Sequence, residues 1–386
     1  MTTKINNEHK KLNVPNLRFK EFQGEWEKTT IGEIATIKNG PFGSVLHAED
    51  YVDEGMPIVT TEHFKSGNLP LSKNGIPQVS EDDYCRLKGY MLETDDIVFS
   101  RVGSVDINAH VEHVQQGWLF SGRVLRVRPI KSVNSLCLHY VLSTESVKRD
   151  IRNRAVGQTM PSINTPILSN TGIYMSQSEA EQKKIANFLS IIDERIATQS
   201  KIIDKLQTLI KGIAHKVSKQ GKPNIRLSEC LLCTSSTLQE SDVAEVGAYP
   251  VYGANGIVGY LDTYNTTSEA IYIIKDGSGV GAVSCVKGKC SATGTLNILQ
   301  TKEGYSLRYL YFILKVFSFE PYKTGMAIPH IYFKDYGKAK IYCPSNQLQC
   351  KYADLLSKIE QKATAEQKIL DNLCSQKQYL LCQLFI

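Results

Sequence analysis

Two long helical patterns that repeat at a fixed distance constrain this chain more than any other feature of its sequence. In each pattern, apolar residues recur in alternating steps of four and three, which is the spacing of a coiled-coil seam. The first seam consists of Ile185, Leu189, Ile192, Ile196, Ile203, Leu206, Ile210, Ile213 and Val217, with a break at Gln199. Adding 167 to these positions gives Tyr352, Leu356, Ile359, Ala363, Leu370, Leu373, Leu380 and Leu384, with polar residues at Glu366 and Lys377. The repeat predicts two similar halves, each ending in a helix that pairs with the other helix, and therefore a bipartite function.

Length and composition favour a two-domain protein of a reducing compartment. The 386 residues suffice for two domains with separate cores. Lys and Arg exceed Asp and Glu by 6, which indicates a polyanionic partner only if the cations gather on one face. Ten cysteines without an apolar N-terminal segment favour the cytoplasm, and no run is long enough to cross a membrane. Because Cys230-x-x-Cys233 has no second pair at zinc spacing, we interpret these residues as ordinary thiols rather than metal ligands.

The order of the patterns predicts five segments. Short strand-like runs such as Asp96–Ser100 and Ala270–Lys275 lie between Gly and Asn turns. Helix is expected in the first body near Leu136–Arg152, of which Leu136–Lys148 matches the helix candidate Leu307–Lys315 in the second body. Ser178, followed three residues later by a glutamate, is a capping-box pattern at the start of the first long helix. The predicted segments are an arm (1–24), a first body (25–177), a central helix (178–220), a second body (221–345) and a C-terminal helix (346–386).

A second copied element lies between each body and its helix. Gly157-Gln158-Thr159-Met160-Pro161-Ser162-Ile163 ends the first body, and Gly325-Met326-Ala327-Ile328-Pro329-His330-Ile331 ends the second, 168 residues later. This Gly-x-x-x-Pro-x-Ile turn should therefore occupy the same place on both bodies. The bodies themselves align poorly, so a constant frame carries two divergent modules.

Four sequence elements in this order resemble the specificity subunit of type I restriction-modification systems. They are VPNLRFKEFQGEWEKTTIGEI (Val14–Ile34), the GQTMPSI turn, EQKKIANFLSIIDERI (Glu181–Ile196) and YPVYGANGIVGY (Tyr249–Tyr260). The resemblance covers nearly the whole chain. It implies an α+β fold with two loop-rich target recognition domains that contain mixed sheets, each followed by a long conserved helix. The two helices would pack as an antiparallel coiled coil with pseudo-twofold symmetry.

The resemblance also implies a function without a catalytic site in this chain. Each target recognition domain would read one half of a split sequence in double-stranded DNA, for defence against foreign DNA. Two methyltransferase subunits would dock on the coiled coil and methylate adenines with S-adenosylmethionine, and restriction subunits would cleave DNA with ATP and Mg²⁺. No cofactor is expected on this chain itself, and the complex should be cytoplasmic.

The coiled coil is predicted to act as a ruler between the two half-sites. Each seam spans 33 residues, which corresponds to roughly 50 Å of helix, whereas half-sites one DNA turn apart lie about 34 to 36 Å from each other. A four-residue insertion after Leu206 should therefore lengthen the unread spacer, and an unchanged spacer would refute the ruler. Gln199 and Glu366 should fall in neighbouring layers, where they either fix the register as a buried polar pair or face solvent at a wet point. Replacing both with Leu distinguishes these two interpretations.

Polar and basic residues in turns are the candidates for DNA contact, because phosphates bind Lys and Arg while base edges bind Arg, Asn, Gln and Ser. In the first body the candidates are Lys38, Asn39, Ser44, His47, Arg101, Ser104, Arg123, Arg152, Arg154, Gln158 and Thr159. In the second body they are Tyr252, Asn255, Lys275, Ser278, Ser291, Thr293, Lys323, Thr324 and His330. Arg101 and Lys275 both follow an apolar strand and precede x-Gly-Ser, so they are predicted to occupy equivalent loops.

Two rival functions stay open at this point: a complete enzyme with an unrecognised site, and a coiled-coil scaffold without DNA specificity. Gly277-Ser278-Gly279-Val280-Gly281 follows a strand but precedes a short β-branched segment, which favours a tight hairpin over a nucleotide loop. The chain contains no Asn-Pro-Pro-aromatic or Asp-Pro-Pro-aromatic element of adenine methyltransferases and no nuclease-type carboxylate pattern. A scaffold without DNA specificity would not need two bodies of divergent sequence.

Overall fold

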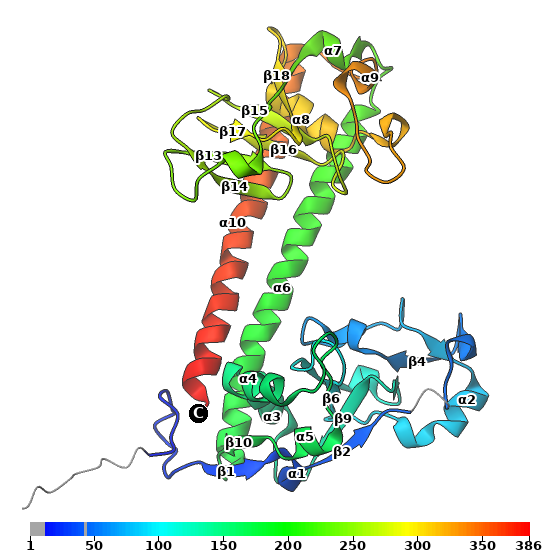
Figure 1. The fold of residues 1–386 in the computed structure, drawn as a ribbon, viewed down its shortest axis with the longest axis vertical. Helices are drawn as coiled ribbons and strands as arrows, with labels where there is room; N and C mark the ends of the chain where they lie inside the picture. Colours follow the sequence, from blue (N-terminus) through cyan, green and yellow to red (C-terminus); the bar gives the residue numbers. More distant parts are fainter. Residues whose placement is uncertain (1–11, 42–44) are drawn as a thin grey trace, which may run out of the picture. The chain divides into compact units, whose positions relative to one another are not determined.

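The computed structural model describes residues 12–41 and 45–386, which form two compact units. Unit 1 comprises the chain up to Ile196 together with Asp371–Ile386, and unit 2 comprises Ala197–Leu370. Two long helices, α6 (Glu179–Ser218) and α10 (Asn346–Leu384), each run through both units (Figure 1). Each unit therefore contains one loop-rich body and one part of each long helix.

The seam residues explain why the halves of α6 and α10 pack in each unit. All of the predicted seam positions, including the polar ones, are buried or half-buried. In unit 1 the core includes Leu189 of α6 and Leu384 of α10, whereas in unit 2 it includes Ile210 of α6 and Leu356 of α10. The N-terminal half of one helix thus meets the C-terminal half of the other in both units. This arrangement confirms the predicted antiparallel pairing within each unit.

Local hydrogen bonds and residue types explain where α6 begins and ends. The amide of Glu181 donates to the Ser178 hydroxyl at 3.3 Å, as the capping-box pattern predicts. The Glu181 carboxylate does not complete the box, because it accepts hydrogen bonds from Ser176 and Arg18 instead. The first helix ends shortly before Gly221 and Pro223, which cannot extend it.

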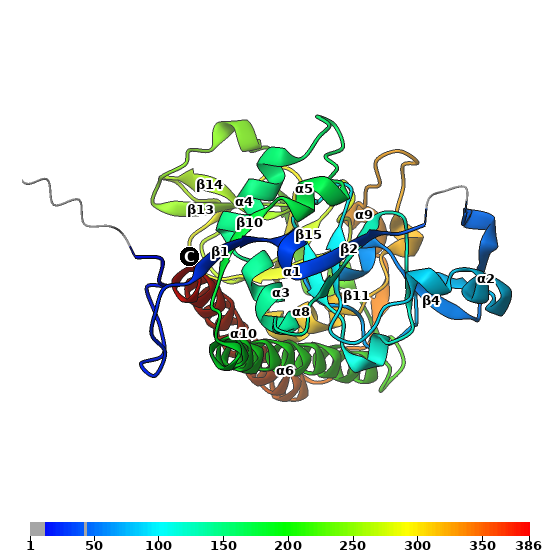
Figure 2. The ribbon, with the colours of Figure 1, turned by 90° about the horizontal axis from the view of Figure 1, so that it is seen from below.

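Unit 1 is built mainly from short strands. Its strands are β1 (Glu27–Thr30), β2 (Ala35–Asn39), β3 (Tyr51–Val52), β4 (Met56–Val59), β5 (Gln78–Val79), β6 (Ile97–Ser100), β7 (Asn108–His110), β8 (Leu119–Phe120), β9 (Val124–Pro129) and β10 (Gly172–Met175). Its short helices are α1 (Ile31–Ile34), α2 (Glu81–Arg86), α3 (Ser135–Leu142), α4 (Glu145–Arg154) and α5 (Thr165–Ser169). The sheets have the orders β2-β9-β6-β7, β3-β5-β4-β8 and β1-β10, and among the strands of the described residues only β4 and β8 pair in parallel. Figure 2 shows α3 beside the N-terminal half of α6.

Unit 2 repeats this plan with different residues. Its strands are β11 (Ile225–Arg226), β12 (Leu231–Ser235), β13 (Tyr249–Gly253), β14 (Gly256–Leu261), β15 (Ala270–Ile274), β16 (Val283–Val286), β17 (Ser291–Ala292), β18 (Leu296–Thr301) and β19 (Lys340–Ile341). Its short helices are α7 (Leu227–Cys230), α8 (Leu307–Lys315) and α9 (Phe333–Tyr336). The sheet orders are β12-β18-β15-β16, β14-β13-β17 and β11-β19, again with one parallel pair, β13 and β17. The mixed sheets confirm the predicted α+β class, and the antiparallel β15–β16 pair confirms the predicted hairpin.

The junction between each body and the long helices is made by the same hydrogen bonds. Gln182 accepts from the Asn134 amide at 2.7 Å and donates to the Ser176 carbonyl at 2.8 Å. Gln349, 167 residues later, accepts from the Ser306 amide at 3.0 Å and donates to the Pro344 carbonyl at 2.8 Å. Both glutamines are buried. Each one satisfies an amide at the start of α3 or α8, which would otherwise lack a partner.

A tyrosine and a carboxylate fasten the same short helices to the long ones. In unit 1 the Tyr140 hydroxyl donates to Asp193 at 2.8 Å, and the Lys377 ammonium pairs with the same carboxylate at 2.6 Å. In unit 2 the Tyr311 hydroxyl donates to Glu360 at 2.7 Å. Burial, and secondarily the adjacent carboxylate, raises the pKa of both phenols, so they remain donors. We call the paired helices with these glutamine and tyrosine contacts the frame.

The described part of the predicted arm, residues 12–24, lies against the frame of unit 1. The Leu17 amide donates to the Gln383 carbonyl at 2.9 Å, and the Arg18 guanidinium binds both Glu181 oxygens at 2.6 and 2.8 Å. Phe19 contacts Phe188 edge to face. These contacts order a segment whose composition alone indicated no structure.

Gln199 and Glu366 meet within unit 2. The Gln199 side-chain amide donates to the Glu366 carboxylate at 2.5 Å and to the Glu366 backbone carbonyl at 3.0 Å. Both side chains are half-buried, and Lys362 lies 3.5 Å from the same carboxylate. The breaks in the two seams therefore form one polar contact between the helices rather than two separate solvated positions.

Candidate nucleic-acid interface

Most of the candidate contact residues of unit 1 gather at one edge of its main sheet. Since β9 is antiparallel to both β2 and β6, the ends of β2 and β6 lie beside the start of β9. The Gly40 amide donates to the Val124 carbonyl at 3.1 Å, and the Arg101 amide donates to the Arg123 carbonyl at 3.0 Å. We call the residues at these strand ends, 39–41, 101–104 and 121–123, together with the turn at 156–162, the unit 1 edge.

The copied turn is attached to this edge by its backbone. The Gly103 amide donates to the Pro161 carbonyl at 2.8 Å, and the Ile163 amide donates to the Arg101 carbonyl at 2.9 Å. Val156 and Ser162 close the turn with a pair of backbone hydrogen bonds of 2.9 and 2.8 Å. Two sequence elements 60 residues apart, the loop after β6 and the Gly-x-x-x-Pro-x-Ile turn, therefore form one surface.

Unit 2 builds the same edge from the corresponding atoms. The Lys275 amide donates to the Thr295 carbonyl at 2.9 Å, and the Gly277 amide donates to the Pro329 carbonyl at 3.0 Å. The Ile331 amide donates to the Lys275 carbonyl at 2.9 Å. The unit 2 edge consists of residues 275–278, 293–295 and the turn at 324–330. Arg101 and Lys275 thus occupy equivalent loops, as their sequence context predicts.

Glycine is required at the start of each turn. Gly157 and Gly325 have φ values of 103° and 91°, which residues with a side chain rarely adopt. A Cβ atom would also lie 2.7 Å from the Met160 carbonyl oxygen in unit 1, and 2.3 Å from the Ile328 carbonyl oxygen in unit 2. The shared conformation therefore explains why both turns begin with glycine although the residues between glycine and proline differ.

Each edge presents a cation, Arg123 in unit 1 and Lys275 in unit 2; Glu62 lies close enough to Arg123 to interact with its charge without forming an ion pair. Within the described residues, neither Arg123 nor Lys275 forms an ion pair. Arg123 is exposed and Lys275 is half-buried. Arg101, beside Arg123, donates from its guanidinium to the Gly122 carbonyl at 3.1 Å. Cations that form no internal ion pair at a polar surface are suited to a polyanion.

Other predicted cations are already engaged within the protein. Arg152 pairs with Asp106 and Glu145, and Arg154 pairs with Asp150 and donates to the Asn170 carbonyl. Lys323 pairs with Glu320, His330 lies 3.2 Å from Asp276, and Lys38 donates to the Gly89 carbonyl. These residues are weaker candidates, because contact with DNA would compete with an existing interaction.

Two predicted contact residues are not at the surface. Ser291 and Thr293 are 3% and 1% exposed. The Ser291 hydroxyl accepts from the Asn265 amide, and the Thr293 hydroxyl bonds that of Thr295. We therefore remove the side chains of both residues from the interface. Ser44 lies outside the described residues.

The other candidates lie at or near the surface. The exposed ones are His47, Ser104, Gln158, Thr159, Asn255, Ser278 and Thr324, and the half-buried ones are Asn39 and Tyr252.

The polar residues that follow β4 also lie at the unit 1 edge, although the sequence pattern did not predict them. The Ser121 amide donates to the Val59 carbonyl at 2.9 Å, which brings Thr60, Thr61 and Glu62 to the unit 1 edge. Together with Tyr51 and the two edge arginines, these residues line a hollow of about 550 Å³. Polar residues directly after a buried strand, the signal that identified Arg101, also occur here. That signal could have identified Thr60 and Thr61.

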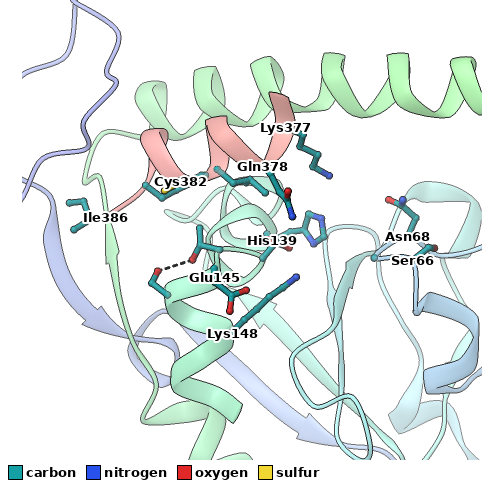
Figure 3. Close-up of a pocket in the computed structure, with 15 residues that line it drawn as sticks. Ser66, Asn68, His139, Glu145, Lys148, Lys377, Gln378, Cys382 and Ile386 are labelled. Carbon is teal, nitrogen blue, oxygen red and sulfur yellow. Dashed lines mark hydrogen bonds between the residues drawn. The ribbon is translucent and has the colours of Figure 1, made fainter. Parts of the chain in front are cut away.

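A second hollow in unit 1 belongs to the frame rather than to the edge. It has a volume of about 390 Å³ and lies between the α3–α4 junction and the last turns of α10. Figure 3 shows His139, Lys148 and Lys377 around it, with Asn68 on a neighbouring loop. His139 is buried and contacts Asn108 through Nδ1 at 2.6 Å. Burial, and secondarily the neighbouring cations, lowers the pKa of His139 to about 3.

The described residues contain no cluster that suggests metal chemistry. No group of three or more His, Cys, Asp or Glu side chains among them is placed to hold a metal ion. Burial raises the pKa of Cys230 to about 12 and that of Cys233 to about 11, so both thiols stay protonated. Among the described residues, no helix is both long and apolar enough to span a membrane.

Comparison with known proteins matches almost the whole chain to one family. A model described as the type I restriction modification DNA specificity domain matches residues 23–208 and 230–374. The MjaX type I restriction enzyme specificity subunit of Methanocaldococcus jannaschii is 28% identical over 229 residues, which are 55% of this chain and half of that protein's length. A type I specificity subunit of Mycoplasma genitalium is 26% identical over 270 residues, which are 64% of this chain and 70% of that protein.

A solved structure shares the fold. The crystal structure of the type I restriction-modification S subunit from M. genitalium matches with a TM-score of 0.65 and 21% identity. The match covers 97% of this chain and 99% of that chain. The fold, with a loop-rich body in each unit and two long helices, is therefore that of a known structure.

Proposed function

The chain belongs to the type I restriction-modification DNA specificity family, and from this premise we propose that it selects the DNA target of such a complex. In this proposal each unit reads one part of a two-part sequence in double-stranded DNA. The target thereby determines which adenines are methylated and which DNA is restricted.

One observation carries the proposal: the same edge is built twice with different side chains. The backbone hydrogen bonds of Arg101 and Gly103 in unit 1 match those of Lys275 and Gly277 in unit 2. The exposed residues of the copied turns nevertheless differ. A repeated backbone fixes how each edge meets a nucleic acid, while divergent side chains let the two edges prefer different bases.

The frame supplies the second part of the proposal. Both α6 and α10 run through the two units without a break, so helix length sets the unread gap between the two half-sites. Phe188 and Leu355, at equivalent positions, are 37% and 47% exposed, although Phe19 of the arm already packs against one edge of Phe188. Apolar side chains that both repeats leave exposed suit two identical partners. We infer that these partners are the two methyltransferase subunits.

The remaining activities are assigned to the partners. We propose that this chain is non-catalytic and binds no cofactor, and that S-adenosylmethionine, ATP and Mg²⁺ act on the methyltransferase and restriction subunits. The assignment is supported by relatives that are named specificity subunits. Ten free cysteines among the described residues are compatible with a cytoplasmic complex.

Mapping of modified adenines tests the proposal. The chain is co-expressed with its cognate methyltransferase subunit in cells that lack adenine methylation, and methylated adenines are located across the genome. We expect a motif of two short blocks separated by a fixed unread gap, which disappears when this chain is omitted. A soluble complex that produces no such motif would refute the proposal and favour a scaffold or an enzyme with an unrecognised site.

A further inference from the structure

The turn of the unit 2 edge ends in a fully apolar, exposed tip. Met326 is completely exposed, and Ile328 is 59% exposed. Ala327, between them, is also exposed, and Pro329 follows. In Figure 1 this turn belongs to the orange loop that leads into α9. Exposing three consecutive apolar residues is unfavourable in water unless a partner covers them.

The tip is held in place by its surroundings. Thr324 and His330 close the turn with backbone hydrogen bonds of 2.9 and 2.8 Å, and Gly277 anchors Pro329. Gly325 provides the conformation that allows the chain to turn. Because the turn is fixed at both ends, the exposure of Met326 and Ile328 is a consequence of the fold and not of a loose loop.

The neighbouring residues indicate the chemistry of the partner. Lys275, whose carbonyl accepts from Ile331, forms no ion pair within the described residues. Ser278 is exposed on the same edge. An apolar tip beside an unneutralised cation and polar side chains matches the surface of DNA, where phosphates flank apolar base faces and methyl groups. A purely apolar protein partner would leave Lys275 buried without a counter-charge.

The corresponding tip of unit 1 has a different character. Its three residues between Gly157 and Pro161 are Gln158, Thr159 and Met160, so only the last is apolar. All three are exposed. Between the glycine and the proline, equivalent backbones thus present two polar side chains and Met160 in unit 1, where Val156 before the glycine is also exposed, and three apolar side chains in unit 2.

We propose that Met326 and Ile328 make apolar contact with bases of the half-site that unit 2 reads. Apolar side chains contact DNA either at a thymine methyl group or by entering a base step, and both contacts remove apolar surface from water. The inference rests on the proposed function and adds a means of readout that does not depend on hydrogen bonds. Because the contact is apolar, it should contribute to affinity at every salt concentration.

The test compares the double variant Met326→Ser/Ile328→Ser with the wild-type chain, each assembled with methyltransferase subunits on the mapped two-part DNA. We expect the variant to assemble normally and to lose affinity and methylation rate about tenfold or more, since two apolar side chains lose their burial. The salt dependence of binding should be unchanged, whereas Lys275→Ala should reduce the log–log slope by about 0.9. Val246→Ser, at a residue that is 85% exposed in unit 2, is the matched control and should behave like wild type.

Two modified DNAs identify the contact. Replacing thymine with uracil in one half-site should weaken the wild type and not the variant if a methyl group is bound. Fluorescence of 2-aminopurine should rise with the wild type alone if a base step is opened. Either response supports the proposal.

Three results would overturn it. The first is methylation by the variant at the wild-type rate, and the second is a loss of binding in which neither DNA reporter responds. The third is failure of the variant to assemble, which would make the tip a protein-docking surface. If the wild-type complex itself shows no two-part target, the proposed function fails and this inference falls with it.

Discussion

The frame and the edges differ in how strictly the two units repeat one another. In the frame, Gln182 and Gln349 make the same two hydrogen bonds, and Tyr140 and Tyr311 both donate to a carboxylate on a long helix. At the edges only the backbone bonds repeat. Side chains in the frame are constrained because each has a hydrogen-bond partner on another element, whereas most side chains at the edges are at least partly exposed and are free to diverge.

This difference explains how one chain can carry two specificities. A frame that fixes strand ends and turns in the same places allows edge residues to change without loss of the fold. Substitutions in the frame should therefore affect stability, and substitutions at the edges should affect DNA selection.

The largest effect is expected from equivalent core leucines of the frame. Leu189 and Leu356, at offset 167, are 0% and 1% exposed. Leu189→Ala and Leu356→Ala should each lower the free energy of unfolding by about 2 to 5 kcal/mol, because a cavity replaces packed atoms. Denaturant unfolding measures the change. The adjacent Leu355→Ala is the control, since Leu355 is exposed and should change stability by less than about 0.5 kcal/mol.

The next largest effect on stability is expected from the two buried glutamines of the frame. Gln182→Ala leaves the Asn134 amide and the Ser176 carbonyl without their partner, and Gln349→Ala does the same in unit 2. Each variant should lose about 1 to 3 kcal/mol of unfolding free energy. Lys183→Ala, at an exposed neighbour, should have almost no effect. Unequal losses in the two units, with one near zero, would show that the frame is not equivalent in the two halves.

A third prediction is that low pH destabilises the part of the frame in unit 1 more than the part in unit 2. His139 of unit 1 has a pKa of about 3 when folded, against about 6.5 when unfolded. Below pH 6.5 the unfolded chain binds a proton that the folded chain does not, so stability falls as the pH falls from 6.5 towards 3. Lowering the pH from 6.5 to 5 should therefore reduce the free energy of unfolding by roughly 1.5 kcal/mol through this histidine.

The equivalent position of unit 2 is Leu310, which is fully buried and cannot titrate. His139→Leu therefore makes unit 1 resemble unit 2 at this point. The variant loses a hydrogen bond and some stability, but its unfolding free energy should vary less with pH over the same range. An unchanged slope would contradict a neutral, buried histidine.

The smallest effect concerns the polar contact between the helices. Gln199→Leu/Glu366→Leu should raise the free energy of unfolding by about 1 kcal/mol, because apolar contacts replace half-buried polar groups. If the pair fixes the register, the variant should also form dimers through mispaired helices, detectable by sedimentation. If the free energy of unfolding does not change and no dimers form, the pair has no role in fixing the register of the helices.

The sequence predicts the frame better than the edges, for a physical reason. A seam with period 3.5 appears in the sequence because most of its packed positions are apolar, and Leu307–Lys315 forms α8 as predicted. The helical region predicted near Leu136–Arg152 is instead two helices, α3 and α4, separated by Ser143 and Thr144. There the Thr144 hydroxyl donates to the Val141 carbonyl rather than continuing the helix.

The edges depend on contacts that sequence spacing does not reveal. Arg101, Arg123 and the turn at 156–162 come together through long-range strand pairing. Ser291 looked like a loop residue, but β17 pairs in parallel with β13 and buries it. Which polar residues face outward is decided by that pairing, so residue type alone could not separate Ser278 from Ser291.

One measurement tests most directly whether the two edges read different DNA. The variants Arg123→Ala and Lys275→Ala are compared in methylation of DNA libraries in which one half-site or the other is randomised, with Lys131→Ala as a control at the opposite end of β9. We predict that Arg123→Ala changes methylation through one half-site and Lys275→Ala through the other, while Lys131→Ala leaves both unchanged. If both edge variants act through the same half-site, or lower methylation equally for every sequence, the central claim is contradicted.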